Sequence, residues 1–275
     1  MKSDLSLPDW RLPPGVSRSL WEFAHDREIA CEEDVHLGGA PLLEFDRYIA
    51  AHWFSTPGRL VDLGCGTGRS LVDFSRRGFD CVGVDLSQAS LEVAAERARD
   101  SGQPVRLARA NLCELGCLPN DQFDYALLLF GTLGMITGSN FRQQALAHAR
   151  RVLRPGGLLM LHVHNVWRHF YSPQGRRWLA RDVVKRLSGN PTAGDTEHDY
   201  RGIPRMYHHP FSRGEITRLL RECGFMIREM IPLAAVGTPA GDSLGEHQGV
   251  PQDLACRGWF KNFEATGWLI LAEAS

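Results

Sequence analysis

Residues 61–68 read Val61-Asp62-Leu63-Gly64-Cys65-Gly66-Thr67-Gly68, a short apolar run that leads into three alternate glycines. Glycine lets the backbone turn sharply and approach a ligand closely, and the N–H groups at the start of a following helix point toward such a ligand. The sequence therefore predicts a strand, a ligand-binding loop and a helix in succession, which is how a parallel α/β sheet begins.

The spacing of the glycines separates three kinds of ligand. A Walker phosphate loop needs Gly-Lys-Ser/Thr after four spacer residues, which Arg69-Ser70 does not supply, so this class is excluded. A dinucleotide loop needs G-x-G-x-x-G, whereas here the third glycine, Gly68, comes one residue early. Asp62 disfavours a pyrophosphate and suits a ligand with an ammonium or sulfonium charge. The loop favours a nucleoside without phosphates, and a NAD-dependent oxidoreductase is the alternative that cofactor titration would decide.

Residues 58–165 alternate short apolar runs with helical patterns. Strands are predicted at 60–63, 81–84, 105–108, 123–130 and 158–163, and helices at 70–77, 88–101 and 141–153. Such alternation is typical of a parallel sheet with right-handed crossovers. Asp85, just after the second predicted strand, is placed to accept hydrogen bonds from both hydroxyls of a ribose.

The rest of the chain is predicted to cover this core and complete its sheet. Helical spacing predicts leading helices at 16–30 and 41–54, an amphipathic helix at 176–187 and a capped helix at 212–223, and strands are predicted at 225–233 and 267–272. We expect four parts: an N-terminal arm and helices over the cofactor site (1–57), a cofactor-binding core (58–165), a helical lid or substrate insertion (166–211), and the last helix and strands of the sheet (212–275).

Composition excludes several classes of protein. The 275 residues carry a net charge of -1, which excludes a globally basic nucleic-acid binder. The longest apolar run, 126–136, is too short to cross a bilayer and no apolar leader stands at the start, so we expect a cytoplasmic protein with no membrane partner. The seven cysteines form no C-x-x-C pair, so no metal site is predicted. Residues 142–228 hold 16 Lys+Arg against 6 Asp+Glu, as a basic rim around an anionic substrate would.

Five segments in order resemble one known family. They are VDLGCGTG at 61–68, VGVDLS at 82–87, the pair Asn111-Leu112, FDYALLLF at 123–130 and LRPGG at 153–157. Together they are similar to the motifs of the class I S-adenosylmethionine-dependent methyltransferases. The resemblance covers 58–165 firmly and 212–275 more loosely. It implies a Rossmann-like methyltransferase fold: a doubly wound, seven-stranded, mostly parallel sheet whose final strand is antiparallel.

The resemblance also implies which residues hold S-adenosylmethionine. Asp62 would orient its amino group beside the loop, and Asp85 would hold its ribose. Asn111 departs from the aspartate of many family members, but its amide oxygen can also accept a hydrogen bond from adenine. The residues implied to line the cofactor site are Asp62, Leu63, Gly64, Cys65, Gly66, Gly68, Asp85, Leu86, Asn111, Leu112, Phe130 and Gly131.

The residues that would face the methyl acceptor are less defined. Transfer from a sulfonium depends mainly on alignment, so a general base is needed only for some acceptors, such as a hydroxyl. His164 follows the fifth predicted strand at the sheet edge where α/β proteins bind ligands, and it is the first candidate base, with His208 the second. His162 is expected to be a hydrogen-bonded core residue.

The expected reaction is methylation of an oxygen or nitrogen of a small molecule. Arginines at 168, 176, 177, 201 and 205 favour an anionic one. An RNA methyltransferase is the second interpretation, and the chain lacks the Asn/Asp-Pro-Pro-aromatic motif of nucleic-acid amino methylation. A protein that binds S-adenosylmethionine without catalysis also stays open, as does the oligomeric state.

Overall fold

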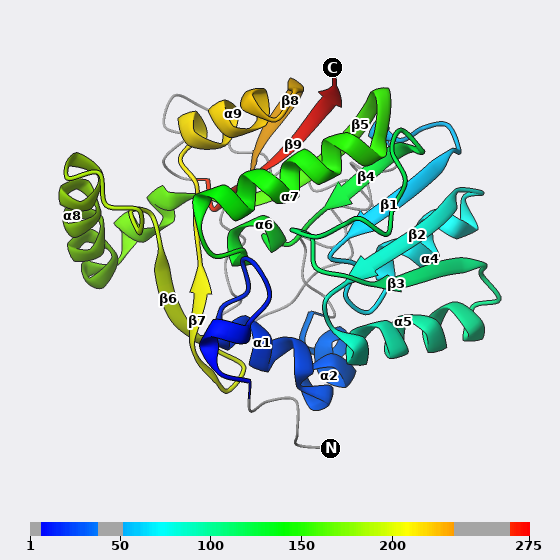
Figure 1. Ribbon diagram of the computed structural model, residues 1–275, viewed down its shortest axis with the longest axis horizontal. Helices are drawn as coiled ribbons and strands as arrows, with labels where there is room; N and C mark the ends of the chain where they lie inside the picture. Colours follow the sequence, from blue (N-terminus) through cyan, green and yellow to red (C-terminus); the bar gives the residue numbers. More distant parts are fainter. Residues whose placement is uncertain (1–6, 38–51, 234–264) are drawn as a thin grey trace, which may run out of the picture.

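The computed structural model describes residues 7–37, 52–233 and 265–275, and its centre is one seven-stranded sheet (Figure 1). The strands lie in the order β3-β2-β1-β4-β5-β9-β8, and β9 runs antiparallel to both of its neighbours. This confirms the predicted mostly parallel sheet with an antiparallel last strand. The strands are β1 (Arg59–Leu63), β2 (Asp80–Asp85), β3 (Val105–Arg109), β4 (Phe123–Leu128), β5 (Leu153–His164), β8 (Phe225–Leu233) and β9 (Gly267–Ala274).

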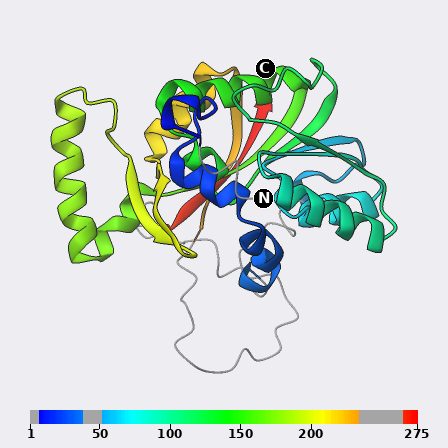
Figure 2. The same cartoon turned by 60° about the horizontal axis from the view of Figure 1, so that its bottom comes forward.

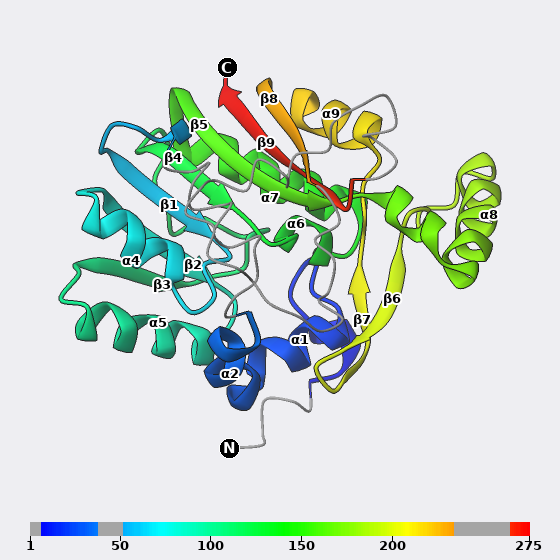
Figure 3. The same ribbon diagram turned by 180° about the vertical axis from the view of Figure 1, so that it is seen from behind.

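Helices cover both faces of this sheet, as a doubly wound fold requires (Figure 3). Side chains alternate along each strand, so that in β1 Leu60 packs on one face and Val61 on the other. Helices α4 and α5 pack against the Leu60 face, and α7 and α9 against the Val61 face. The helices around the sheet are α4 (Arg69–Arg76), α5 (Gln88–Asp100), α6 (Thr132–Met135), α7 (Ser139–Val152) and α9 (Arg213–Glu222).

Two strand boundaries in this core differ from the sequence prediction, and one short helix was not predicted. The fourth strand ends at Leu128, two residues early, because the chain turns through Phe130 and Gly131, both at positive φ, into α6, which was not predicted. The fifth strand begins at Leu153, five residues before the predicted strand at 158–163. Each difference lies where a strand meets its loop.

The first leading helix was expected to be continuous over 16–30 but is two helices, α1 (Arg18–His25) and α2 (Arg27–Leu37). Asp26 separates them with an extended backbone, and its carboxylate accepts a hydrogen bond from the N–H of Ile29 at 3.1 Å. A side chain that caps a new helix in this way ends the previous one. The second leading helix, expected at 41–54, lies mostly outside the described residues.

The insertion after β5 is not wholly helical, which corrects the expected helical lid. It contains the 3-10 helix η2 (Val166–Tyr171) and α8 (Pro173–Leu187), and then a hairpin of β6 (Thr196–Tyr200) and β7 (Ile203–His208). The hairpin turns through Arg201 and Gly202, both at positive φ, as a two-residue hairpin turn of the primed type requires. Helix α8 projects from the body of the molecule, and the hairpin lies beside α1 (Figures 1 and 2).

None of the helices in the described ranges is both long and apolar enough to cross a bilayer. The part boundaries proposed above and the cytoplasmic location stay predictions.

Candidate active site

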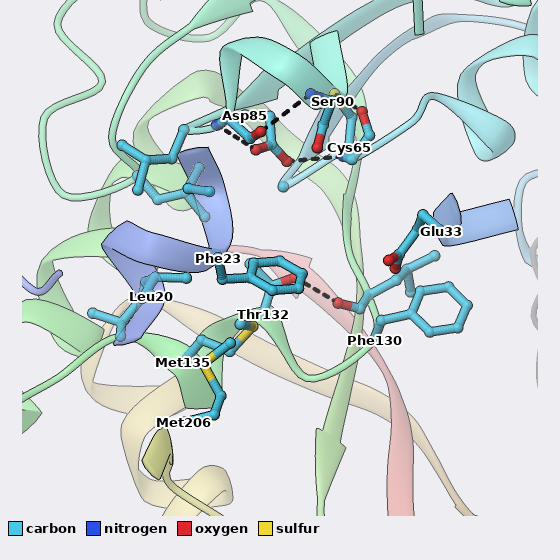
Figure 4. Close-up of a pocket in the computed structure, with 18 of the residues that line it drawn as sticks. Leu20, Phe23, Glu33, Cys65, Asp85, Ser90, Phe130, Thr132, Met135 and Met206 are labelled. Atoms are coloured by element: carbon cyan, nitrogen blue, oxygen red, sulfur yellow. Dashed lines mark hydrogen bonds between the residues drawn. The ribbon is translucent and has the colours of Figure 1, made fainter. Parts of the chain in front are cut away.

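A cavity of about 630 Å³ opens at the carboxyl ends of the parallel strands. The loop after β1 and the end of β2 form one end of it, and the ends of β5 and β7 form the other. Helices α1 and α2 wall the side, where Leu20, Phe23 and Glu33 face the space (Figure 4). The loop residues were expected from the sequence, whereas these helix residues were not, because nothing local marks them as ligand-facing.

Each of the three glycines in the loop is required for a different structural reason. A Cβ at Gly64 would lie 2.7 Å from Thr132 Cγ2, and one at Gly68 would lie 2.8 Å from Ala94 Cβ on α5. A Cβ at Gly66 would have no atom within 4 Å, because this residue faces the cavity. The loop is therefore packed on both sides and open in the middle, which suits close approach of a ligand to backbone.

The Asp85 side chain, at the end of β2, connects this strand to the glycine loop through hydrogen bonds. One carboxylate oxygen accepts a hydrogen bond from the N–H of Gly66 and the other from the N–H of Ser87, both at 2.8 Å. Burial raises the pKa of Asp85, and these hydrogen bonds oppose that rise. Each carboxylate oxygen has a second lone pair, so the group can still accept two hydroxyl hydrogen bonds.

Asp62 is a buried carboxyl, only 4% exposed, at the same end of the cavity. Its pKa is raised to about 7, mainly by burial and also by the neighbouring Asp85, while Arg69 opposes the rise. Two carboxyls held close together away from water are stabilised by a bound cation. This donor set fits the ammonium group and the ribose of S-adenosylmethionine.

Most of the residues implied by the family resemblance line the cavity, and three do not. Leu63 is in the core, Gly68 packs against α5, and Gly131 makes room for histidine side chains. Asn111 lines the cavity, but its amide donates to the carbonyl of Pro14 at 2.8 Å and its oxygen accepts from the N–H of Cys113 at 3.1 Å. The implied residues that line the cavity are Asp62, Gly64, Cys65, Gly66, Asp85, Leu86, Asn111, Leu112 and Phe130.

His164 and His208 meet at the other end of the cavity. His164 Nδ1 lies 2.9 Å from His208 Nε2, although the residues are far apart in sequence. Burial is the main cause that lowers the pKa of His208 to about 3 and holds the pKa of His164 well below its usual range. Both rings are therefore neutral near pH 7, and one donates to the other. Such a pair offers one free donor and one free acceptor nitrogen.

His162 is buried, as expected, at 2% exposure. The expected hydrogen bond is absent at Nδ1, which has no partner among the residues with described positions. Burial lowers the pKa of His162 to about 4, so the ring is neutral near pH 7.

A buried polar network, which the sequence analysis missed, joins the insertion to the core. His209 Nδ1 lies 2.7 Å from Asp195 Oδ1, and His209 Nε2 lies 2.8 Å from Glu215 Oε1 on α9. Tyr207 also donates to Asp195 at 2.7 Å, and Arg142 on α7 donates to the Tyr207 hydroxyl at 2.9 Å. Burial would raise the pKa of Asp195, but the hydrogen bonds from His209 and Tyr207 outweigh it and lower the pKa. His209 therefore bridges a carboxyl group of the insertion and a carboxyl group of α9.

Comparison with known proteins agrees with this geometry. Residues 60–157 match the family described as a methyltransferase domain. A demethylmenaquinone methyltransferase of Tropheryma whipplei is 29% identical over 167 residues, which cover 60% of this chain and 65% of that protein. A ubiquinone/menaquinone biosynthesis C-methyltransferase of Syntrophotalea carbinolica is 28% identical over 176 residues, covering 61% and 68%. The chain spans between about half and two thirds of the length of such curated relatives.

Solved structures show the same fold. A methyltransferase structure from Methanosarcina mazei has a TM-score of 0.61 at 19% identity and covers 81% of this chain and 95% of its own. The 1,6-didemethyltoxoflavin-N1-methyltransferase of Burkholderia thailandensis, solved with its acceptor and S-adenosylhomocysteine, has a TM-score of 0.57 at 19% identity and covers 88% and 82%.

The ordered motifs, the strand order and the family match together indicate the class. Residues 60–157 match a methyltransferase domain, and this match, the strand order and the methyltransferase relatives support a class I S-adenosylmethionine-dependent methyltransferase. S-adenosylmethionine is the cofactor of this domain.

Proposed function

We propose that this protein transfers a methyl group from S-adenosylmethionine to an oxygen or nitrogen of a small, anionic molecule. The observation that carries the proposal is one continuous cavity with two carboxyls beside the glycine loop at one end and the His164–His208 pair at the other. When bound, the cofactor supplies an electrophilic methyl group on a sulfonium.

The chain's own residues would hold the cofactor at the carboxyl end of the cavity. Asp62 would orient the amino group and Asp85 the ribose, while Leu86 and Leu112 would cover the adenine. The open backbone at Gly66 supports this placement, because no side chain fills the space in front of it. Phe130, with the Arg69 guanidinium 5.7 Å from its ring centroid, would form the wall between the two ends.

The histidine pair would face the acceptor. If His164 Nδ1 donates to His208 Nε2, His164 Nε2 is left with a lone pair that can take a proton from an acceptor hydroxyl. His208 would then act as a positioning residue that fixes the tautomer of His164. An amine acceptor needs no such base, so the pair matters less for nitrogen methylation.

A small acceptor is favoured because the cavity is walled by α1, α2 and the β6–β7 hairpin. The structure from Burkholderia thailandensis was solved with the small acceptor 1,6-didemethyltoxoflavin. The relative from Tropheryma whipplei is named a demethylmenaquinone methyltransferase, and the relative from Syntrophotalea carbinolica a ubiquinone/menaquinone biosynthesis C-methyltransferase. A carbon acceptor therefore belongs among the compounds to be tested, and RNA is included as the competing class.

The test begins with calorimetric titration of the full chain with S-adenosylmethionine, S-adenosylhomocysteine and NAD. We expect the first two to bind and NAD not to bind. Radiolabelled methyl transfer is then measured with panels of hydroxyl, amine and carbon acceptors and with total RNA. Binding of NAD alone would overturn the proposal, transfer only to RNA would replace its acceptor class, and binding without any transfer would favour a non-catalytic protein.

The His164→Gln variant tests the proposed base. We expect its kcat for a hydroxyl acceptor to fall about 100-fold, with a smaller loss for an amine and no change in S-adenosylhomocysteine affinity. His208→Gln should lower the same kcat less and shift its pH profile. His148→Gln is the matched control, because His148 lies on α7 and does not line the cavity. An unchanged kcat in His164→Gln would remove the base from the mechanism.

A further inference from the structure

Charge is segregated within the cavity. Asp62 and Asp85 lie at the end that we assign to the cofactor. The third carboxylate that lines the cavity, Glu33, is paired with Arg201, whose Nη1 lies 2.6 Å from its Oε2. The acceptor end therefore has no unpaired carboxylate from the residues that line it.

The acceptor end instead carries the guanidinium of Arg168, on η2. Arg168 lines the cavity, and its side chain makes no hydrogen bond or ion pair with any residue in the described ranges. Its positive charge lies close enough to lower the pKa values of His164, His169, His198 and His208, after the larger effect of burial. These four rings are neutral near pH 7, so they do not balance the charge of Arg168.

The position of Arg168 is fixed by the base of the insertion. Asn165, fully buried, caps η2 by accepting a hydrogen bond from the N–H of Trp167 at 3.1 Å. Its side-chain amide donates to the carbonyl of Ala265 at 2.8 Å, which ties this turn to the start of the last strand. These hydrogen bonds fix the backbone from which the exposed side chain of Arg168 extends at the cavity wall. A guanidinium without a partner among the described residues is available to bind an anion.

The other arginines of the insertion are not placed in this way. Arg205 is paired with Glu197 at 2.6 Å, Arg201 is paired with Glu33, and Arg176 donates to the carbonyl of Phe170. Arg177 is exposed on α8 and does not line the cavity. Arg168 is thus the arginine of the insertion that reaches the proposed acceptor.

We propose that Arg168 binds an ionised acid group of the methyl acceptor, a carboxylate or a phosphate ester, while the atom to be methylated reaches the His164–His208 pair. The planar guanidinium matches both groups through two parallel hydrogen bonds. This inference rests on the proposed function, because it assigns the opposite end of the cavity to the cofactor.

The experiment uses the full chain saturated with S-adenosylhomocysteine and a library of aromatic compounds in matched sets. Each set holds a carboxylate, a phosphate ester and the uncharged primary amide of one ring system, with binding measured by ligand-observed NMR. The variants are Arg168→Gln, Arg168→Lys and the control Arg177→Gln. The carboxylate and phosphate arms distinguish the two sources of negative charge.

We expect the wild-type protein to bind at least one acid about tenfold more tightly than its amide. Arg168→Gln should remove this preference while leaving S-adenosylhomocysteine affinity unchanged, Arg168→Lys should keep part of it, and Arg177→Gln should keep all of it. Three results would each refute the proposed role of Arg168: equal affinity for acids and amides, no binding of any acid, or a preference for acids that is retained in Arg168→Gln. If acids bind through Arg168 but no methyl group is transferred, the proposed function is refuted while the proposed acid-binding role of Arg168 is retained.

Discussion

The two ends of the cavity are built in opposite ways. The cofactor end comes from one short stretch, the loop 62–68 and Asp85 at the end of β2, and backbone N–H groups donate to the Asp85 carboxylate. The acceptor end joins β5 to a hairpin more than 30 residues further along the chain, through contacts between side chains. The structure of the cofactor end follows from the conformation of residues close together in the sequence, whereas the acceptor end depends on packing between distant segments.

The electrostatics of the two ends also differ. Carboxyls meet at the cofactor end, and burial raises the pKa values of both Asp62 and Asp85. Neutral imidazoles and one guanidinium meet at the acceptor end. A ligand with a cationic part and a partner with an anionic part would each relieve the charge of one end. Substitutions that remove a charge at one end at a time can test this contrast.

The largest effect is expected where the acceptor end is fastened to the core. His209→Leu would leave the carboxylates of Asp195 and Glu215 without their shared donor. We expect the free energy of unfolding at pH 7 to fall by about 3 to 5 kcal/mol, because one partner of a buried charged network is lost. Urea unfolding measures the change, and His148→Leu, on the partly exposed side of α7, serves as control. A loss below that of the control would mean that the hairpin holds without this network.

The next largest effect is expected at the cofactor end. Asp85→Ala removes the acceptor for the N–H of Gly66 and the proposed acceptor for the ribose hydroxyls. We expect S-adenosylhomocysteine to bind about 1 to 3 kcal/mol more weakly by calorimetry. Asp80→Ala is the matched control, because Asp80 stands at the opposite end of the same strand, paired with Arg106. Equal affinities of the two variants would refute the assignment of Asp85.

The smallest effect concerns the stability of the ligand-free cofactor end. Because the pKa of Asp62 is about 7 in the native state and about 4 in an unfolded chain, the protonated carboxyl favours folding. That contribution is complete below pH 4 and is lost as the pH rises through 7. Asp62→Asn should therefore raise the free energy of unfolding by about 1 to 2 kcal/mol at pH 8, with no gain at pH 4.

The same variant should bind S-adenosylhomocysteine more weakly, because it lacks the carboxylate that we propose to face the amino group of this ligand. Urea unfolding at both pH values and calorimetry at pH 8 check the two parts. An Asp62→Asn protein that is less stable than wild type at pH 8 would contradict the argument that this end is destabilised by its own charge.

The fold and the cofactor end could be predicted because their signals are local. Alternate apolar runs, the glycine spacing and Asp85 each act within a few residues, and the predicted sheet with its antiparallel last strand is confirmed. The hairpin was missed because β6, Thr-Glu-His-Asp-Tyr, has no apolar alternation. Its turn uses Arg201-Gly202, with the Arg201 guanidinium bound by Glu33, rather than the Asn-Gly that usually marks such a turn.

The site was predicted unevenly for the same reason. His164 and His208 were both chosen as candidates, but their separation of 2.9 Å between ring nitrogens follows only from the hairpin. Leu63, Gly68 and Gly131 belong to the right motifs, yet they pack against protein rather than line the cavity. A motif indicates a loop, and packing decides which of its side chains reach the ligand.

The network around His209 has a consequence for exchanging acceptor pockets between enzymes. The insertion contributes Asp195, Tyr207 and His209, and the core contributes Arg142 and Glu215. A transplanted 166–211 segment would bring half of this set into a recipient that lacks the other half. The segment that we propose to select the acceptor is therefore not independent of the core, and a working chimera would have to include the partner residues on α7 and α9.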